Sequence, residues 1–218
     1  PAAVPVVLDL WSYGLPSPLP VLRGGGGGAT GRPKHLAHRL KLGLYDRWCW
    51  PATSCLTVVS EEDLLRCETA HPGQRVVVVP NGVDCQAIRP KPDQAMTSPV
   101  LLFTGDMSAE SDVDAATVLA TEVFPSIRRE FPKAELRLVG RTPDPRVTRL
   151  AGPGITVTGN VPDMQAHLRA ATIYVAPHFT TSGTRTKLLE AMAAGLPIIT
   201  TSLAIEGIKV QPGRDLLV

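Results

Sequence analysis

The stretch from Ala171 to Thr201 constrains the fold most, because it contains a complete strand–loop–helix–strand pattern. Residues 173–176 and 198–201 form short apolar runs, rich in β-branched side chains and bounded by proline, which is typical of buried strands. Good helix formers fill the interval from Leu188 to Ala193. Gly195, with a proline two residues later, stops that helix. The stretch therefore predicts two buried strands joined by one helix.

The same alternation runs through the second half of the chain. Strands are expected at 100–104, 135–139 and 155–158, and helices at 111–127, 145–150 and 164–170. Strands that alternate with helices predict right-handed crossovers and a doubly wound α/β domain with a parallel sheet. Ligands of such sheets bind beyond the carboxyl ends of the strands. Gly105, Gly140 and residues 177–184 are expected at those ends.

The first half gives a less complete version of this pattern. Strands are expected at 4–10, 55–59 and 76–79, with the last of them buried, and helices at 34–50 and after Ser60. The glycine run 24–28 lacks the lysine and hydroxyl residue that end a phosphate loop, so a surface loop is expected there. Prolines at 90, 92 and 99 predict an extended connector. We therefore expect two domains, a partial one at 1–90 and a nearly complete one at 91–218.

Composition excludes several classes of protein. A net charge of +2 without a basic stripe argues against nucleic-acid binding. No apolar stretch reaches the ~18 residues that span a bilayer. The four cysteines lack metal-ligand spacing, and His167 and His178 are isolated, so no metal site is expected. Reduced thiols indicate a cytoplasmic protein, although the cysteine count leaves a disulfide open.

The expected helix at 34–50 carries basic side chains on one face and apolar side chains on the other. Such a helix suits an anionic membrane surface. The alternative is an ordinary helix that covers a sheet. Peripheral contact with the inner face of the membrane is therefore an open alternative for this segment.

The loop at residues 180–184 is small and hydroxyl-rich, and it leads directly into the expected helix. Backbone N–H groups and the positive end of the helix dipole would favour an anion there. Arg185 and Lys187 oppose that dipole unless a phosphate or a carboxylate neutralises them. Glu190 is a lone carboxylate on an otherwise apolar helix. The alternative is that both cations are solvated and that Glu190 is an exposed residue paired with Thr186 or Arg185.

The segment SGTRTKLLEAMAAGLPIITTSLAIEGI resembles the donor-site signature of family 4 of the retaining, nucleotide-sugar-dependent glycosyltransferases. Five further motifs match in the same order, VVSEED, VVPNGVD, LLFTGDM, LRLVGRTPDP and VTGNVPDM, and the similarity covers roughly residues 39–218. The resemblance implies the GT-B architecture, with a cleft between two Rossmann-like domains. It also implies a fragment, which would be inactive alone.

The resemblance further implies retaining transfer of a sugar from a nucleotide-diphosphate sugar to a polysaccharide, glycan or lipid-linked acceptor, without a metal or other cofactor. Glu190 would accept hydrogen bonds from the ribose hydroxyls, and no catalytic residue is assigned. The implied donor-binding residues are Glu190, Lys187, Arg185, Gly183, Thr184, Arg141 and Ser182. Ser182 stands where many members carry a carboxylate. An epimerase or phosphorylase of the same fold, or a catalytically silent nucleotide-binding lobe, are the alternatives.

Overall fold

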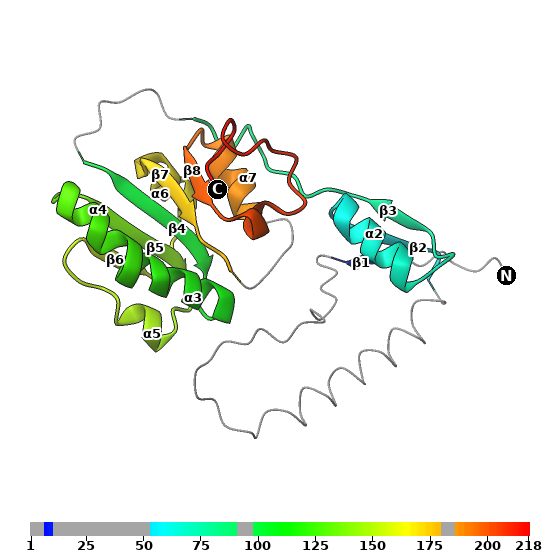
Figure 1. The fold of residues 1–218 in the computed structure, drawn as a ribbon, viewed down its shortest axis with the longest axis horizontal. Coiled ribbons are helices and arrows are strands. Elements are labelled where there is room, and N and C mark those ends of the chain that lie inside the picture. The colour runs from blue at the N-terminus through cyan, green and yellow to red at the C-terminus, as the bar shows by residue number, and fades with distance from the viewer. Residues whose placement is uncertain (1–6, 11–52, 91–97, 180–185) are drawn as a thin grey trace, which may run out of the picture. The chain divides into compact units, whose positions relative to one another are not determined.

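A computed structural model describes residues 7–10, 53–90, 98–179 and 186–218 (Figure 1). The chain separates into two compact units, residues 1–80 and 81–218. The boundary expected from the prolines lies ten residues later. Residues 81–90 pack with the second unit, where Ile88 contacts the core and Pro90 lies beside Gly195.

The first unit contains a three-stranded parallel sheet in the order β1-β2-β3. Its elements are β1 (Val7–Leu10), β2 (Cys55–Val58), α2 (Glu61–Ala70) and β3 (Val76–Val78). The Ser60 side chain accepts a hydrogen bond from the Asp63 amide at 3.1 Å, as an N-cap residue should. The strand expected at 76–79 is present as β3, but the expectation that it is buried is wrong, because Val77 and Val79 are exposed. The predicted helix at 34–50 and the glycine run lie outside the described residues.

The second unit is built on a five-stranded sheet in the order β6-β5-β4-β7-β8, in which every pairing is parallel. The strands are β4 (Val100–Asp106), β5 (Glu135–Arg141), β6 (Ile155–Thr158), β7 (Ile173–Ala176) and β8 (Ile198–Thr200). The chain order reverses between β4 and β7, since β4 pairs with β5 on one side and with β7 on the other. The expected doubly wound α/β sheet is therefore confirmed.

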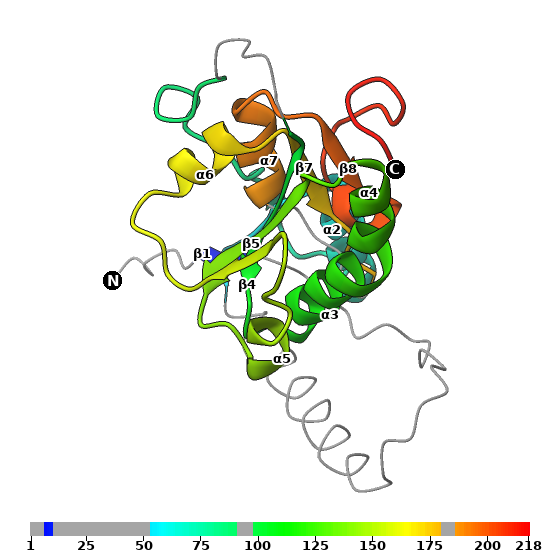
Figure 2. The same ribbon diagram turned by 90° about the vertical axis from the view of Figure 1, so that its left-hand side faces the viewer.

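Helices cover both faces of this sheet, with α3 and α4 on one face and α6 and α7 on the other (Figures 1 and 2). Their bounds are α3 (Glu110–Val118), α4 (Phe124–Glu130), α5 (Pro145–Thr148), α6 (Met164–Ala170) and α7 (Thr186–Ala193). A 3-10 turn, η3 (Ser202–Ile205), follows β8. Phe103 and Leu138 belong to the core under α3 and α4, whereas Leu102 and Leu188 belong to the core under α6 and α7. This double cover explains why the central strand β4 is buried almost throughout.

The single helix expected at 111–127 is interrupted by a π-helical turn, η2 (Leu119–Val123). Pro125, in the first turn of α4, explains the interruption. A proline has no N–H, and its ring clashes with the carbonyl four residues earlier. A single wider turn relieves that clash without ending the helix.

A buried hydrogen bond joins the two strands at the reversal, since Thr104 Oγ1 lies 2.8 Å from Tyr174 Oη. We expect Tyr174→Phe and Thr104→Val each to lower the free energy of unfolding by about 1–2 kcal/mol. Each substitution leaves the hydroxyl of the other residue buried without a hydrogen-bond partner. The double variant should lose clearly less than the sum of the two, because neither partner then remains. Urea unfolding of the four proteins measures this coupling. Strictly additive losses would contradict the account of this contact.

Candidate functional site

The candidate site lies at the carboxyl ends of β4 and β7, where the strand order reverses. Ligands of doubly wound sheets bind in the crevice at this point. Segments from two distant parts of the sequence meet here through one side chain, Asp112. They are the end of β4 from one part, and the residues after β7 with the first turn of α7 from the other.

Asp112 belongs to α3 and is 3% exposed. Its Oδ2 accepts hydrogen bonds from the Asp106 amide at 2.7 Å and from Lys187 Nζ at 3.1 Å. Its Oδ1 lies 2.9 Å from Nε2 of His178. Burial by itself raises the pKa of Asp112, but the hydrogen bond with His178 and the charge of Lys187 outweigh it and lower that pKa to about 2. Asp112 is therefore an ionised, buried carboxylate.

His178 is buried, at 2% exposure, with its ring centroid 5.6 Å from that of Phe103. An ionised carboxylate only accepts hydrogen bonds, so the imidazole Nε2 carries the proton in the bond to Asp112. The buried Nδ1 has no hydrogen-bond partner within the described part of the chain. His178 is isolated in the sequence, and the fold gives it Asp112 as a partner.

Lys187 lies in the first turn of α7, and its side chain is about one-third exposed (33%). The sequence predicts that a cation at this position needs a phosphate or a carboxylate to neutralise it. Asp112 supplies such a carboxylate from within the chain. An ammonium group has three N–H donors, so contact with Asp112 does not exhaust its capacity to bind an anion.

Glu190 follows Lys187 by three residues on α7, which places the two side chains on neighbouring positions of the helix surface. Burial raises the pKa of Glu190, and the charge of Lys187 partly opposes that rise. The charge of Glu190 also contributes to the raised pKa of Tyr174, after the larger effect of burial. Glu190 is thus half-buried beside β7, and the alternative of an exposed helix residue is not supported.

Arg141 ends β5 and pairs with Asp106 at the end of β4, with Nη2 and Oδ2 3.1 Å apart. The Arg141 side chain is 70% exposed. The sequence predicts Arg141 as a donor-binding cation, and the structure places it at the same sheet edge as Asp112. There Arg141 is held by its ion pair with Asp106.

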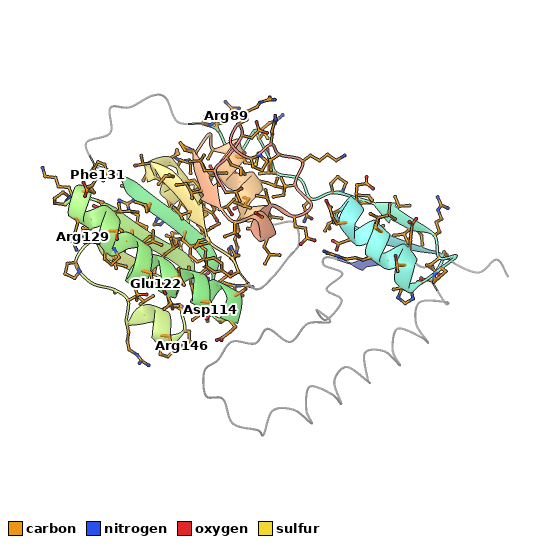
Figure 3. All side chains as sticks on the ribbon, viewed as in Figure 1. Arg89, Asp114, Glu122, Arg129, Phe131 and Arg146 are labelled. Carbon is orange, nitrogen blue, oxygen red and sulfur yellow. The ribbon has the colours of Figure 1, made fainter. Side chains whose placement is uncertain are left out.

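The acidic residues after β4 do not gather into one cluster. Glu110 pairs with Arg146 of α5 at 2.8 Å, while Asp106 pairs with Arg141. Figure 3 shows Asp114 on α3 and Arg146 on α5. Among the described residues, no group of three or more potential ligands could hold a metal ion.

Four predicted donor-binding residues, Ser182, Gly183, Thr184 and Arg185, lie outside the described residues. The structure brings together Lys187 and Glu190, with Arg141 at the adjoining strand end. Local sequence patterns miss Asp112 and His178 as members of the site. The signal that could have found them is their position. Asp112 lies in the first turn of the helix after β4, and His178 follows β7, and these two strands flank the reversal.

Residues 98–218, which are 121 of the 218 residues, match the family model described as glycosyl transferases group 1. The chain belongs to this family. A phosphatidyl-myo-inositol mannosyltransferase of Mycolicibacterium smegmatis is 30% identical over 139 residues, which cover 60% of this chain and 35% of the relative. The chain thus spans about a third of the length of the curated relatives it matches. These findings confirm the resemblance drawn from the sequence motifs.

Two solved structures are similar to the chain in fold. WaaG, a glycosyltransferase involved in lipopolysaccharide biosynthesis, gives a TM-score of 0.67 at 17% identity, covering 93% of this chain and 57% of WaaG. Anabaena Alr3699/HepE in complex with UDP and glucose gives 0.64 at 16% identity, covering 98% and 57%. These similarities confirm the expected GT-B-type α/β fold. Within the described residues, no helix has the length and apolar character needed to cross a bilayer.

Proposed function

We propose that the chain carries the donor-binding domain of a retaining glycosyltransferase, which transfers a sugar from a nucleotide-diphosphate sugar to an acceptor. The observation that supports this most is the position of Lys187 and Glu190. Both lie on the first turns of α7, at the reversal between β4 and β7 where ligands of such sheets bind. Family membership supports the same conclusion.

The arrangement suits the chemistry of glycosyl transfer. Cleavage of the bond between sugar and phosphate leaves negative charge on the diphosphate, and a preorganised cation stabilises that charge as it develops. Lys187 provides the cation, next to the positive end of the α7 dipole. Glu190 would accept hydrogen bonds from the ribose hydroxyls. The amides of Gly183 and Thr184, with Ser182, Arg185 and Arg141, complete the proposed donor set.

We also propose a glycan or lipid-linked acceptor and a cytoplasmic protein that contacts the inner face of the membrane. The mannosyltransferase relative is named for phosphatidyl-myo-inositol, which supports a lipid-linked acceptor. The basic segment at 34–50 provides the side chains that an anionic surface would attract. No metal or other cofactor is included in this proposal.

Activity is tested by incubating the full-length protein with a panel of nucleotide-diphosphate sugars and measuring release of the nucleoside diphosphate. We expect release from one donor, accelerated by a lipid-linked or glycan acceptor, and a product that keeps the anomeric configuration of the donor by NMR. Interconversion of the donor sugar without transfer would instead indicate an epimerase. Binding without any turnover would indicate a silent nucleotide-binding lobe.

Glu190→Gln should weaken binding of both the nucleoside diphosphate and the bare nucleoside by about 1–3 kcal/mol, because it removes charged hydrogen bonds to ribose hydroxyls. Isothermal titration of both ligands measures the loss, and circular dichroism checks that the fold is unchanged. Glu122→Gln is the matched control, since Glu122 is exposed on η2 (Figure 3) and should have no effect. Unchanged affinity in Glu190→Gln would rule out the ribose role.

A further inference from the structure

Lys187, the proposed phosphate-binding cation, already has an anion as its partner. The Asp112 carboxylate lies 3.1 Å from Lys187 Nζ and is itself fixed by His178 and the Asp106 amide. Because Asp112 is buried and ionised, it remains charged when a ligand arrives. What this pair does when a ligand binds rests on the proposed function.

Geometry brings a bound phosphate close to this carboxylate. A phosphate oxygen that accepts a hydrogen bond from Lys187 Nζ lies about 3 Å from it, so it lies within roughly 6 Å of Asp112 Oδ2. Two anions at that separation in a partly buried site repel each other strongly. Arg141 at the neighbouring strand end is paired with Asp106.

The repulsion acts more strongly on the product than on the substrate. When the sugar leaves, the terminal phosphate of the nucleoside diphosphate gains an ionisable oxygen and therefore more negative charge. A fixed carboxylate beside the phosphate site destabilises the more highly charged ligand more. Lys187 also loses side-chain order when Asp112 is removed, but this cost is small and is the same for both ligands.

We propose that Asp112 is an internal counter-anion that occupies Lys187 in the empty site and limits how tightly the nucleoside diphosphate product is held. Asp112 thereby sets the preference of the site for donor over product. It acts through Lys187 and through its own charge. It is a specificity-determining residue that touches neither the sugar nor the acceptor in this account.

The test compares wild type with Asp112→Asn, in which the amide oxygen can still accept from the Asp106 N–H. Dissociation constants are measured for one nucleoside diphosphate, its sugar conjugate and the bare nucleoside. We expect Asp112→Asn to bind the diphosphate about tenfold more tightly, the sugar conjugate about threefold more tightly and the nucleoside unchanged. Product inhibition by the nucleoside diphosphate should strengthen in parallel. Asp114→Asn, two residues along α3, is the matched control and should change none of these values.

Weaker diphosphate binding in Asp112→Asn would overturn the proposal, because Asp112 would then position Lys187 for the ligand. Unchanged binding would also overturn it and leave Asp112 as a structural residue. Should Asp112→Asn not fold, Asp112→Ser carries the same prediction. If wild type binds no nucleoside diphosphate, the proposed function fails together with this inference. If wild type binds the nucleoside diphosphate and the variants do not bind it more tightly, the inference alone fails.

Discussion

Gly140→Ala is expected to lower the free energy of unfolding of the second unit by about 3–5 kcal/mol, among the largest effects of a single substitution. A Cβ at Gly140 would overlap the carbonyl oxygen of Gly105 and lie 2.9 Å from its carbonyl carbon. These are backbone atoms of β4, paired in register with β5. The overlap can be relieved only by separating β4 from β5, which breaks the hydrogen bonds between these two strands.

The matched control is Gly159→Ala, because a Cβ at Gly159 would meet no atom within 4 Å. This variant should stay within about 0.5 kcal/mol of wild type or be slightly more stable, since alanine restricts the unfolded chain. Urea unfolding of the three proteins gives the comparison. A loss below 1 kcal/mol in Gly140→Ala would contradict the close approach of β4 and β5 at their carboxyl ends.

Lys187→Gln should weaken binding of a nucleoside diphosphate by about 10- to 100-fold and leave binding of the bare nucleoside almost unchanged, since a charged hydrogen bond is worth about 1.5–3 kcal/mol. The contrast between the ligands identifies a phosphate contact. A residue that only supports the fold would affect both ligands alike. Titration of both ligands at one salt concentration measures the contrast.

The same substitution should also lower the free energy of unfolding by about 1 kcal/mol, because Asp112 loses a cationic partner while it stays buried. The sequence pattern alone predicts the opposite sign, since a cation in the first turn opposes the helix dipole. Lys133→Gln is the control, because Lys133 is exposed and should affect neither binding nor stability. Equal losses for both ligands would reassign Lys187 to a structural role.

The elements of the second unit could be predicted well because their signals are local. Strand β7 and helix α6 have the predicted bounds, since their apolar and helix-forming patterns are contained within a few positions. The π turn could not be predicted in this way. In the sequence, Pro125 is equally compatible with the start of a new helix. A wider turn is needed only because the helix continues from α3 through Pro125 into α4.

The candidate site could be predicted only in part. Lys187 and Glu190 carry local signals, as charged residues on a helix that is otherwise apolar. Asp112 lies 66 residues from His178 and 75 from Lys187 in sequence, so no local pattern joins them. As a helix-start aspartate, Asp112 resembles a cap, yet its carboxylate accepts from the Asp106 amide and two side chains of other segments. Long-range pairing of this kind depends on the strand order.

The carboxyl ends of β4 and β7 are expected to bind the diphosphate of a nucleotide sugar. Isothermal titration of wild type with a panel of nucleoside diphosphates and their matching nucleosides tests this binding. We expect one nucleoside diphosphate to bind about 10- to 100-fold more tightly than its nucleoside, and Lys187→Gln to remove most of that difference. Absence of binding by every nucleoside diphosphate, or equal affinity for nucleoside and nucleoside diphosphate, would contradict the claim.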